Sequence, residues 1–149
     1  MEIVLAPDVY VNASVALGSP PERVVTKLFS AGKGKAKATE WILERIEAML
    51  GAIPAFKKDA ITHQMEVIRS LVEVVEELDK HGPDAWEAAL VAAAKASKVA
   101  RVVTDHPDLL AKEGSGGIEF VSTETWLVEA ALPPPPPPPS AKKSAPPSA

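Results

Sequence analysis

The 149-residue chain contains no cysteine, which excludes a disulfide-stapled scaffold and any zinc site with cysteine ligands. Its three histidines, His63, His81 and His106, are too scattered to give the ligand spacing of a zinc site. No apolar run approaches the roughly 18 residues that span a membrane, and the N-terminus lacks a basic region followed by an apolar signal core. We therefore expect a cytoplasmic protein with no membrane partner, and any catalysis to depend on carboxylates.

The chain also lacks an excess of positive charge. Its formal net charge is −4, which gives no overall attraction for nucleic acid, because phosphate binding depends on clustered lysine and arginine. One local cluster does exist, formed by Lys27, Lys33, Lys35 and Lys37. It has two interpretations: a basic lip beside an acidic site, or a solvated loop, which is the more ordinary explanation of such a run.

Acidic residues follow apolar segments at several points of the chain. Ile3 to Leu5 leads to Asp8, and Val102-Val103 leads to Asp105 and Asp108, while the apolar segment 118–121 also gives way to polar residues. Buried strands followed by polar loops and helices are typical of a parallel α/β sheet, whose ligands bind beyond the carboxyl ends of the strands. The alternative is that these acids only form turns and helix caps.

Between these strands the apolar spacing predicts helices over residues 20–31, 39–50, 57–80 and 83–96. Thr39 is a suitable cap for the second of them. In the last, which is rich in alanine, Asp84 and Glu87 have the spacing of a capping box. A functional interpretation is compatible with the structural one: Glu87, on the first turn, points its carboxylate into the crevice that Asp8 and Asp105 share.

Three segments together resemble the PIN domain family, the metal-dependent ribonuclease fold of the VapC-type toxins. Residues 5–13 resemble its opening strand with Leu-Asp-Thr-Asn, residues 103–110 its Val-Thr-Gly-Asp-x-Asp-Leu-Leu pattern, and residues 117–127 its closing glycine, strand and helix. The resemblance covers nearly all of residues 1–132. It implies a PIN-like three-layer sandwich, with a central, mostly parallel sheet flanked by helices.

The resemblance also implies a set of site residues. The mid-chain glutamate of the family corresponds to Glu44, the acid that opens the alanine-rich helix to Glu87, and the later aspartate to Asp108. The family uses such carboxylates to hold Mg²⁺ or Mn²⁺, which activates a water and neutralises charge on the phosphate. Asp8 and Asp105 lie one to two residues from acid positions of the family rather than on them. With these two residues, a rebuilt catalytic set is Asp8, Glu44, Glu87 and Asp105, and a metal set is Asp8, Glu87, Asp105 and Asp108.

This chain departs from the family pattern at two of the principal carboxylates. Ala6 stands where the family has its first aspartate, and His106 stands where it has the aspartate after Thr-Gly. One hypothesis is therefore a degenerate site in a binding or regulatory module. The alternative is an active Mg²⁺- or Mn²⁺-dependent endonuclease of single-stranded RNA with a shifted set of carboxylates. The partners implied are single-stranded RNA, an antitoxin-like protein and a second copy of the chain.

The composition changes after Leu132. Residues 133–139 are seven consecutive prolines, and the following ten residues contain Lys142 and Lys143 but no acid. Consecutive prolines cannot join a helix or a sheet ladder, so we expect a separate tail in the polyproline II conformation. Such a segment is either a spacer or a ligand for a polyproline-binding protein. A third functional hypothesis is thus an adaptor whose α/β domain displays the tail.

Overall fold

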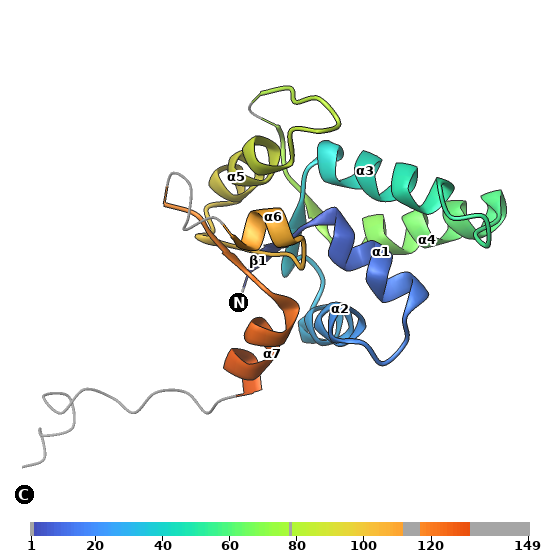
Figure 1. The fold of residues 1–149 in the computed structure, drawn as a ribbon, viewed down its shortest axis with the longest axis horizontal. Helices are drawn as coiled ribbons and strands as arrows, with labels where there is room; N and C mark the ends of the chain where they lie inside the picture. Colours follow the sequence, from blue (N-terminus) through green and yellow to red (C-terminus); the bar gives the residue numbers. More distant parts are fainter. Residues whose placement is uncertain (1, 78, 112–116, 132–149) are drawn as a thin grey trace, which may run out of the picture.

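In the computed structural model, which describes residues 2–77, 79–111 and 117–131, the chain folds around one parallel β-sheet (Figure 1). Its strands are β1 (Ile3–Leu5), β2 (Ala36–Ala38), β3 (Glu73–Val74), β4 (Arg101–Val103) and β5 (Glu119–Val121). They lie in the order β3-β2-β1-β4-β5, and every pairing is parallel. The chain extends first to one side of β1 and then to the other, so the topological switch point lies between β1 and β4.

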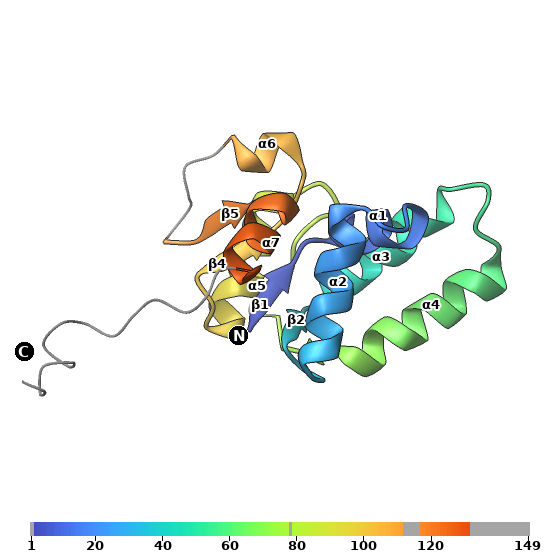
Figure 2. The same ribbon diagram turned by 90° about the horizontal axis from the view of Figure 1, so that it is seen from below.

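Helices cover both faces of this sheet. They are α1 (Pro7–Val15), α2 (Pro20–Ala31), α3 (Glu40–Gly51), α4 (Lys58–Leu71), α5 (Trp86–Ser97), α6 (Pro107–Leu110) and α7 (Thr123–Ala131). Figure 1 shows α5 on one face and α2 with α7 on the other, and Figure 2 shows the same layers from below. The predicted α/β class and PIN-like three-layer arrangement are confirmed, with a sheet that is parallel throughout the described residues.

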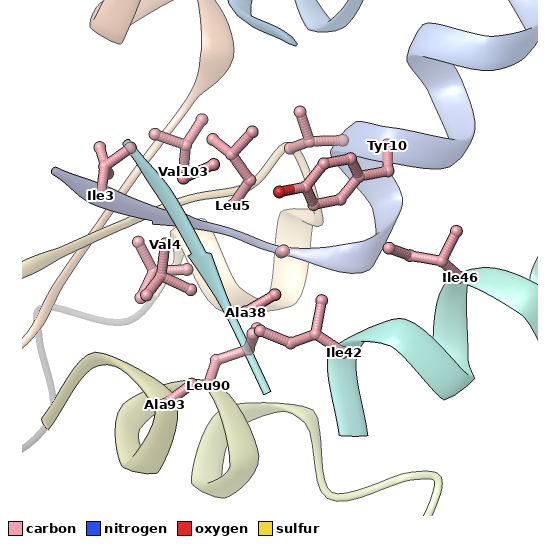
Figure 3. Packing of buried hydrophobic residues seen from close by; sticks show 14 of the residues in the cluster. Ile3, Val4, Leu5, Tyr10, Ala38, Ile42, Ile46, Leu90, Ala93 and Val103 are labelled. Atoms are coloured by element: carbon pink, nitrogen blue, oxygen red, sulfur yellow. The ribbon is translucent and has the colours of Figure 1, made fainter. Parts of the chain in front are cut away.

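The core is centred on β1, whose three residues are all buried. Val4 points toward Leu90 and Ala93 of α5, whereas Leu5 points to the opposite face, where Tyr10 lies (Figure 3). The alternation follows from the twofold repeat of a strand. Because both faces are covered, β1 is apolar at every position rather than at every second one. Small side chains such as Ala93 let α5 lie close to the sheet.

Two strands differ from the sequence prediction. The helix predicted over 57–80 ends at Leu71, and Glu73 and Val74 pair instead with Lys37 and Ala38. The apolar period continues to Val75, so helical spacing alone does not reveal the break. β2 itself has the sequence Ala-Lys-Ala and lacks the β-branched residues that indicate a strand.

The lysine cluster does not form a lip beside the acids. Lys37 is buried in β2 and forms ion pairs with Glu2 and Glu73. Lys33 and Lys35 precede β2, and Lys35 accepts a backbone hydrogen bond from Ile3 at the amino end of β1. These lysines therefore lie at the edge of the sheet opposite to the strand ends that carry the acids.

The predicted proline-rich tail, 133–149, lies outside the described residues, so the division into a domain of residues 1–132 and a tail stays a prediction. Within the described part of the chain, no helix combines the length and apolar character needed to cross a membrane. The apolar side chains of Leu28 and Trp41 are buried in the core, and those of Phe29 and Phe56 pack partly buried against it.

Candidate functional site

Asp8 lies at the topological switch point, in the first turn of α1. The sequence does not continue β1 to this residue, because Pro7 takes the first helical position, where its missing N–H is not needed. The Asp8 side chain is buried, and its two oxygens accept hydrogen bonds from the Thr104 hydroxyl (2.8 Å) and the Asp105 backbone N–H (2.9 Å). Asp8 therefore fastens the end of β1 to the segment that follows β4.

Burial raises the pKa of the Asp8 carboxyl group above its ordinary value, because desolvation disfavours the charged form. The hydrogen bonds from Asp105 and Thr104 act in the opposite direction, and the negative charge of Asp105 adds to the increase. Desolvation is the largest of these effects, because the Asp8 carboxyl group is largely removed from water.

Asp105 connects β4 to the last helix. Its Oδ1 accepts a hydrogen bond from the backbone N–H of Thr123 (2.9 Å), and its Oδ2 accepts one from the Thr123 hydroxyl (2.7 Å). The backbone N–H of Thr123 is one of the unpaired donors at the start of α7, where a negative charge is also favourable. Ser122 caps the same helix by accepting from the Thr125 N–H. The cap interpretation of this acid, left open by the sequence, thus describes Asp105 well.

We expect Asp105→Ala to lower the free energy of unfolding by about 1–2 kcal/mol, because it removes two hydrogen bonds from the first turn of α7. Asp108→Ala is the matched control: this side chain is exposed, so a change within about 0.5 kcal/mol is expected. Urea denaturation followed by circular dichroism measures both. Equal losses in the two variants would contradict the role assigned to Asp105.

An aromatic cluster occupies the same end of the sheet. Trp41 of α3 and Trp86 of α5 pack edge to face, with ring centroids 5.7 Å apart. The His106 ring packs against Trp86 at 5.5 Å and a tilt of 50°. The Trp41 indole N–H donates to the backbone oxygen of Gly82 (2.8 Å), which satisfies its buried polar group. We call Trp41, Trp86 and His106 the aromatic cluster.

His106 also forms hydrogen bonds with residues close to it in the chain. It caps α6, and its ring Nδ1 accepts a hydrogen bond from the Asp108 backbone N–H (3.3 Å), while the backbone N–H of His106 donates to the Thr104 hydroxyl (3.0 Å). Asp8, Thr104 and His106 therefore belong to one hydrogen-bonded network at the carboxyl edge of the sheet.

The other predicted acids are placed less centrally. Glu44 is exposed on α3, and its charge contributes to raising the pKa of Arg69 on α4. Asp108 is exposed on α6, whereas Glu87 is half-buried in the first turn of α5, next to Trp86 in the chain. The predicted capping box is wrong, because α5 begins at Trp86 with Ala85 as its N-cap and no side-chain cap.

In the part of the chain that the structure describes, the acids do not come together as the magnesium or manganese site that the resemblance implies. Such an ion needs several oxygen ligands in near-octahedral geometry at about 2.0–2.1 Å. Each carboxylate oxygen of Asp8 and Asp105 accepts one hydrogen bond from the protein, and these bonds fix the orientation of both side chains. Among the described residues, no group of three or more acidic, histidine or cysteine side chains is arranged to hold a metal.

The site contains residues that the sequence reasoning did not assign to it. Thr104 and Thr123 bind the two aspartates, and Trp86 joins the other two aromatic residues. The sequence signal for Thr104 was its position directly after the apolar residues Val102 and Val103. Nothing local to Trp41 or Trp86 indicates their contact, because α3 and α5 come together only in the folded chain.

Comparison with known proteins was informative only at the level of structure. No family model and no curated protein matches the sequence. Among solved structures, the fold is similar to a chain in the crystal structure of VapBC2 from Rickettsia felis bound to a DNA fragment from their promoter. The TM-score is 0.59 and the identity 11%, over 82% of this chain and 98% of the other. The likeness shows a shared fold and supports the PIN-like architecture.

Proposed function

We propose that this protein is a PIN-like domain of the toxin type that does not hold the catalytic metal and acts as a binding or regulatory module. The observation that carries the proposal is the use of Asp8 and Asp105 as structural acceptors. Each carboxylate satisfies two donors of this chain, one of them a backbone N–H. These oxygens keep lone pairs for an ion, but turning either carboxylate toward one would strain the hydrogen bonds that connect β1, the segment after β4 and α7.

The aromatic cluster supports the same proposal. In the family pattern, the positions of Ala6 and His106 carry aspartates, and here one side chain is a fully buried methyl group and the other packs on Trp86. When bound, a divalent ion would supply an activated water and neutralise charge on a phosphate. The residues at this edge of the sheet instead fix the loops after β1, β4 and β5 relative to one another.

A protein partner suits this module better than nucleic acid alone. The similar solved structure is named as a VapBC2 assembly with promoter DNA, and by analogy we propose an antitoxin-like protein as the partner of this chain. The net charge of −4 provides no electrostatic attraction for RNA or DNA by itself. Single-stranded RNA as a substrate belongs to the alternative function.

That alternative is an endoribonuclease dependent on Mg²⁺ or Mn²⁺. Its support is the position of Asp8 and Asp105, which are adjacent at the switch point, with Glu87 on the first turn of the helix that carries Trp86. The shifted set of carboxylates would bind the ion through the remaining lone pairs of both aspartates, together with Glu87. The exposed position of Glu44 does not add a fourth ligand.

Calorimetric titration of Mn²⁺ into the metal-free full-length protein tests the proposal, together with cleavage of a fluorescent single-stranded RNA in Mn²⁺. We expect no binding heat beyond that of dilution, and no cleavage. Glu87→Gln and Asp105→Asn are the controls, since both remove a charge and keep the side-chain size. Saturable heat or RNA cleavage that both variants abolish would overturn the proposal in favour of the nuclease. Cleavage that both variants retain would indicate a contaminating nuclease.

A further inference from the structure

A groove lies away from the acidic edge of the sheet, between α1, α2 and α4. Its volume is about 300 Å³, and its walls are mainly apolar, with Leu17, Val25, Phe29 and Val67 among the lining residues and Tyr10 at its base. Leu17 is 87% exposed, the largest exposed fraction among the exposed large apolar side chains of the described residues. An apolar side chain left in water beside an apolar groove indicates a surface that another segment covers.

The polar groups of the groove favour a ligand that accepts hydrogen bonds. The Gln64 amide donates one N–H to the Ser14 hydroxyl (3.0 Å), and a primary amide has a second N–H to offer. A proline segment has carbonyl acceptors but no backbone donors. Glu22 is the one charged side chain among the described lining residues. Recognition of polyproline II segments uses apolar and aromatic grooves of this kind, because the ligand has little conformational entropy to lose.

We infer that the groove between α1, α2 and α4 binds the proline-rich segment 133–139 of the same chain. α7 packs against α2 and ends at Ala131, and Figures 1 and 2 show α2 between α7 and α4. A helix is about 10 Å wide, and seven residues of polyproline II extend about 22 Å. The segment is therefore long enough to cross α2 and enter the groove in its own molecule.

Charge favours the same occupant. Lys142 and Lys143 follow the prolines with no acid beyond residue 132, so the tail contributes +2 to the formal net charge of −4 and the rest of the chain carries −6. Glu22 gives the groove a negative charge that complements these lysines. The tail would then be a ligand of its own domain rather than a spacer.

The absence of cysteine allows a direct test on the full-length chain. A nitroxide label on Ser140→Cys broadens the NMR signals of amides that lie near the tail. We expect loss of signal intensity for Leu17, Phe29 and Gln64, and none for Ala93 on α5, on the opposite face of the sheet. Unchanged intensities at the groove would overturn the inference.

Two variants of the labelled protein sharpen the result. Leu17→Asp changes an exposed side chain and should restore the groove signals without affecting the fold. Replacing residues 133–139 with alternating glycine and serine keeps tail length and charge, and should also restore them. Broadening that persists in either variant would show that the lysines alone hold the tail, contrary to the inference.

A mixture distinguishes binding within one molecule from binding between copies. Isotope-labelled protein without nitroxide is mixed with unlabelled protein that carries it. We expect no broadening in the mixture. Broadening of the groove signals there would place the tail of one copy on another and overturn docking within the chain. None of these outcomes depends on metal binding, so they are independent of the proposed function.

Discussion

Trp41→Ala is expected to lower the free energy of unfolding by about 3–5 kcal/mol, the largest loss among the substitutions considered for this protein. The indole is buried, packs edge to face on Trp86 and donates a hydrogen bond to Gly82. Its removal leaves a cavity between α3 and α5 and takes away the hydrogen bond to Gly82. Urea denaturation followed by circular dichroism measures the loss, since it does not depend on the tryptophan that is removed.

Trp41→Phe separates packing from hydrogen bonding. Phenylalanine keeps much of the apolar contact with Trp86 but cannot donate to Gly82, so a loss of about 1–2 kcal/mol is expected. Near-neutral results for both variants would contradict the packing described for the aromatic cluster, and equal large losses would show that the hydrogen bond dominates.

Asp8→Ala is expected to destabilise the protein by about 2–3 kcal/mol at neutral pH. The substitution leaves two donors without their acceptor, the Thr104 hydroxyl and the Asp105 N–H. It also relieves the desolvation of a buried carboxylate, which keeps the loss below the sum of two broken charged hydrogen bonds. A variant as stable as the parent would show that the connection between β1 and β4 does not depend on this residue.

The stability of the parent protein relative to Asp8→Asn is expected to depend on pH. The pKa of Asp8 is raised in the folded state by burial, so the charged carboxylate destabilises the fold above that pKa. As pH falls from neutral to about 4, the folded protein takes up this proton before the unfolded chain does, and the penalty disappears. The stability of the parent relative to Asp8→Asn should therefore rise as pH falls. A relative stability that falls or stays constant in denaturant titrations at both pH values would contradict the raised pKa.

The architecture was predictable where sequence pattern and burial agree. β1, β4 and β5 are apolar at nearly every position, because both faces of a parallel sheet are covered, and the helices between them have clear apolar stripes. Thr39 caps α3 as predicted, with its hydroxyl accepting from the Ile42 N–H. β2 and β3 were missed because three residues of Ala-Lys-Ala and two at the end of a helical period carry no strand signal.

The candidate site was predicted in position but not in arrangement. Strand ends correctly indicated where Asp8 and Asp105 lie, because topology alone brings the ends of β1 and β4 together. The sequence could not show that each carboxylate is already bound by a threonine, since Thr104 and Thr123 are distant from their partners along the chain or across the sheet. Glu44 matches the family by register, but its position on the exposed surface of α3 is set by how that helix packs.

The strand order also limits when the chain can fold during its synthesis. β1 is the first of the described strands to be synthesised, yet it lies in the middle of the sheet, and Val4 pairs with Lys37 on one side and Val102 on the other. The second of these partners, Val102, is synthesised 98 residues after Val4. Until then the apolar segment Ile3–Leu5 has one open edge, so a nascent chain that stops before Arg101 should be unable to fold stably and should need protection from aggregation.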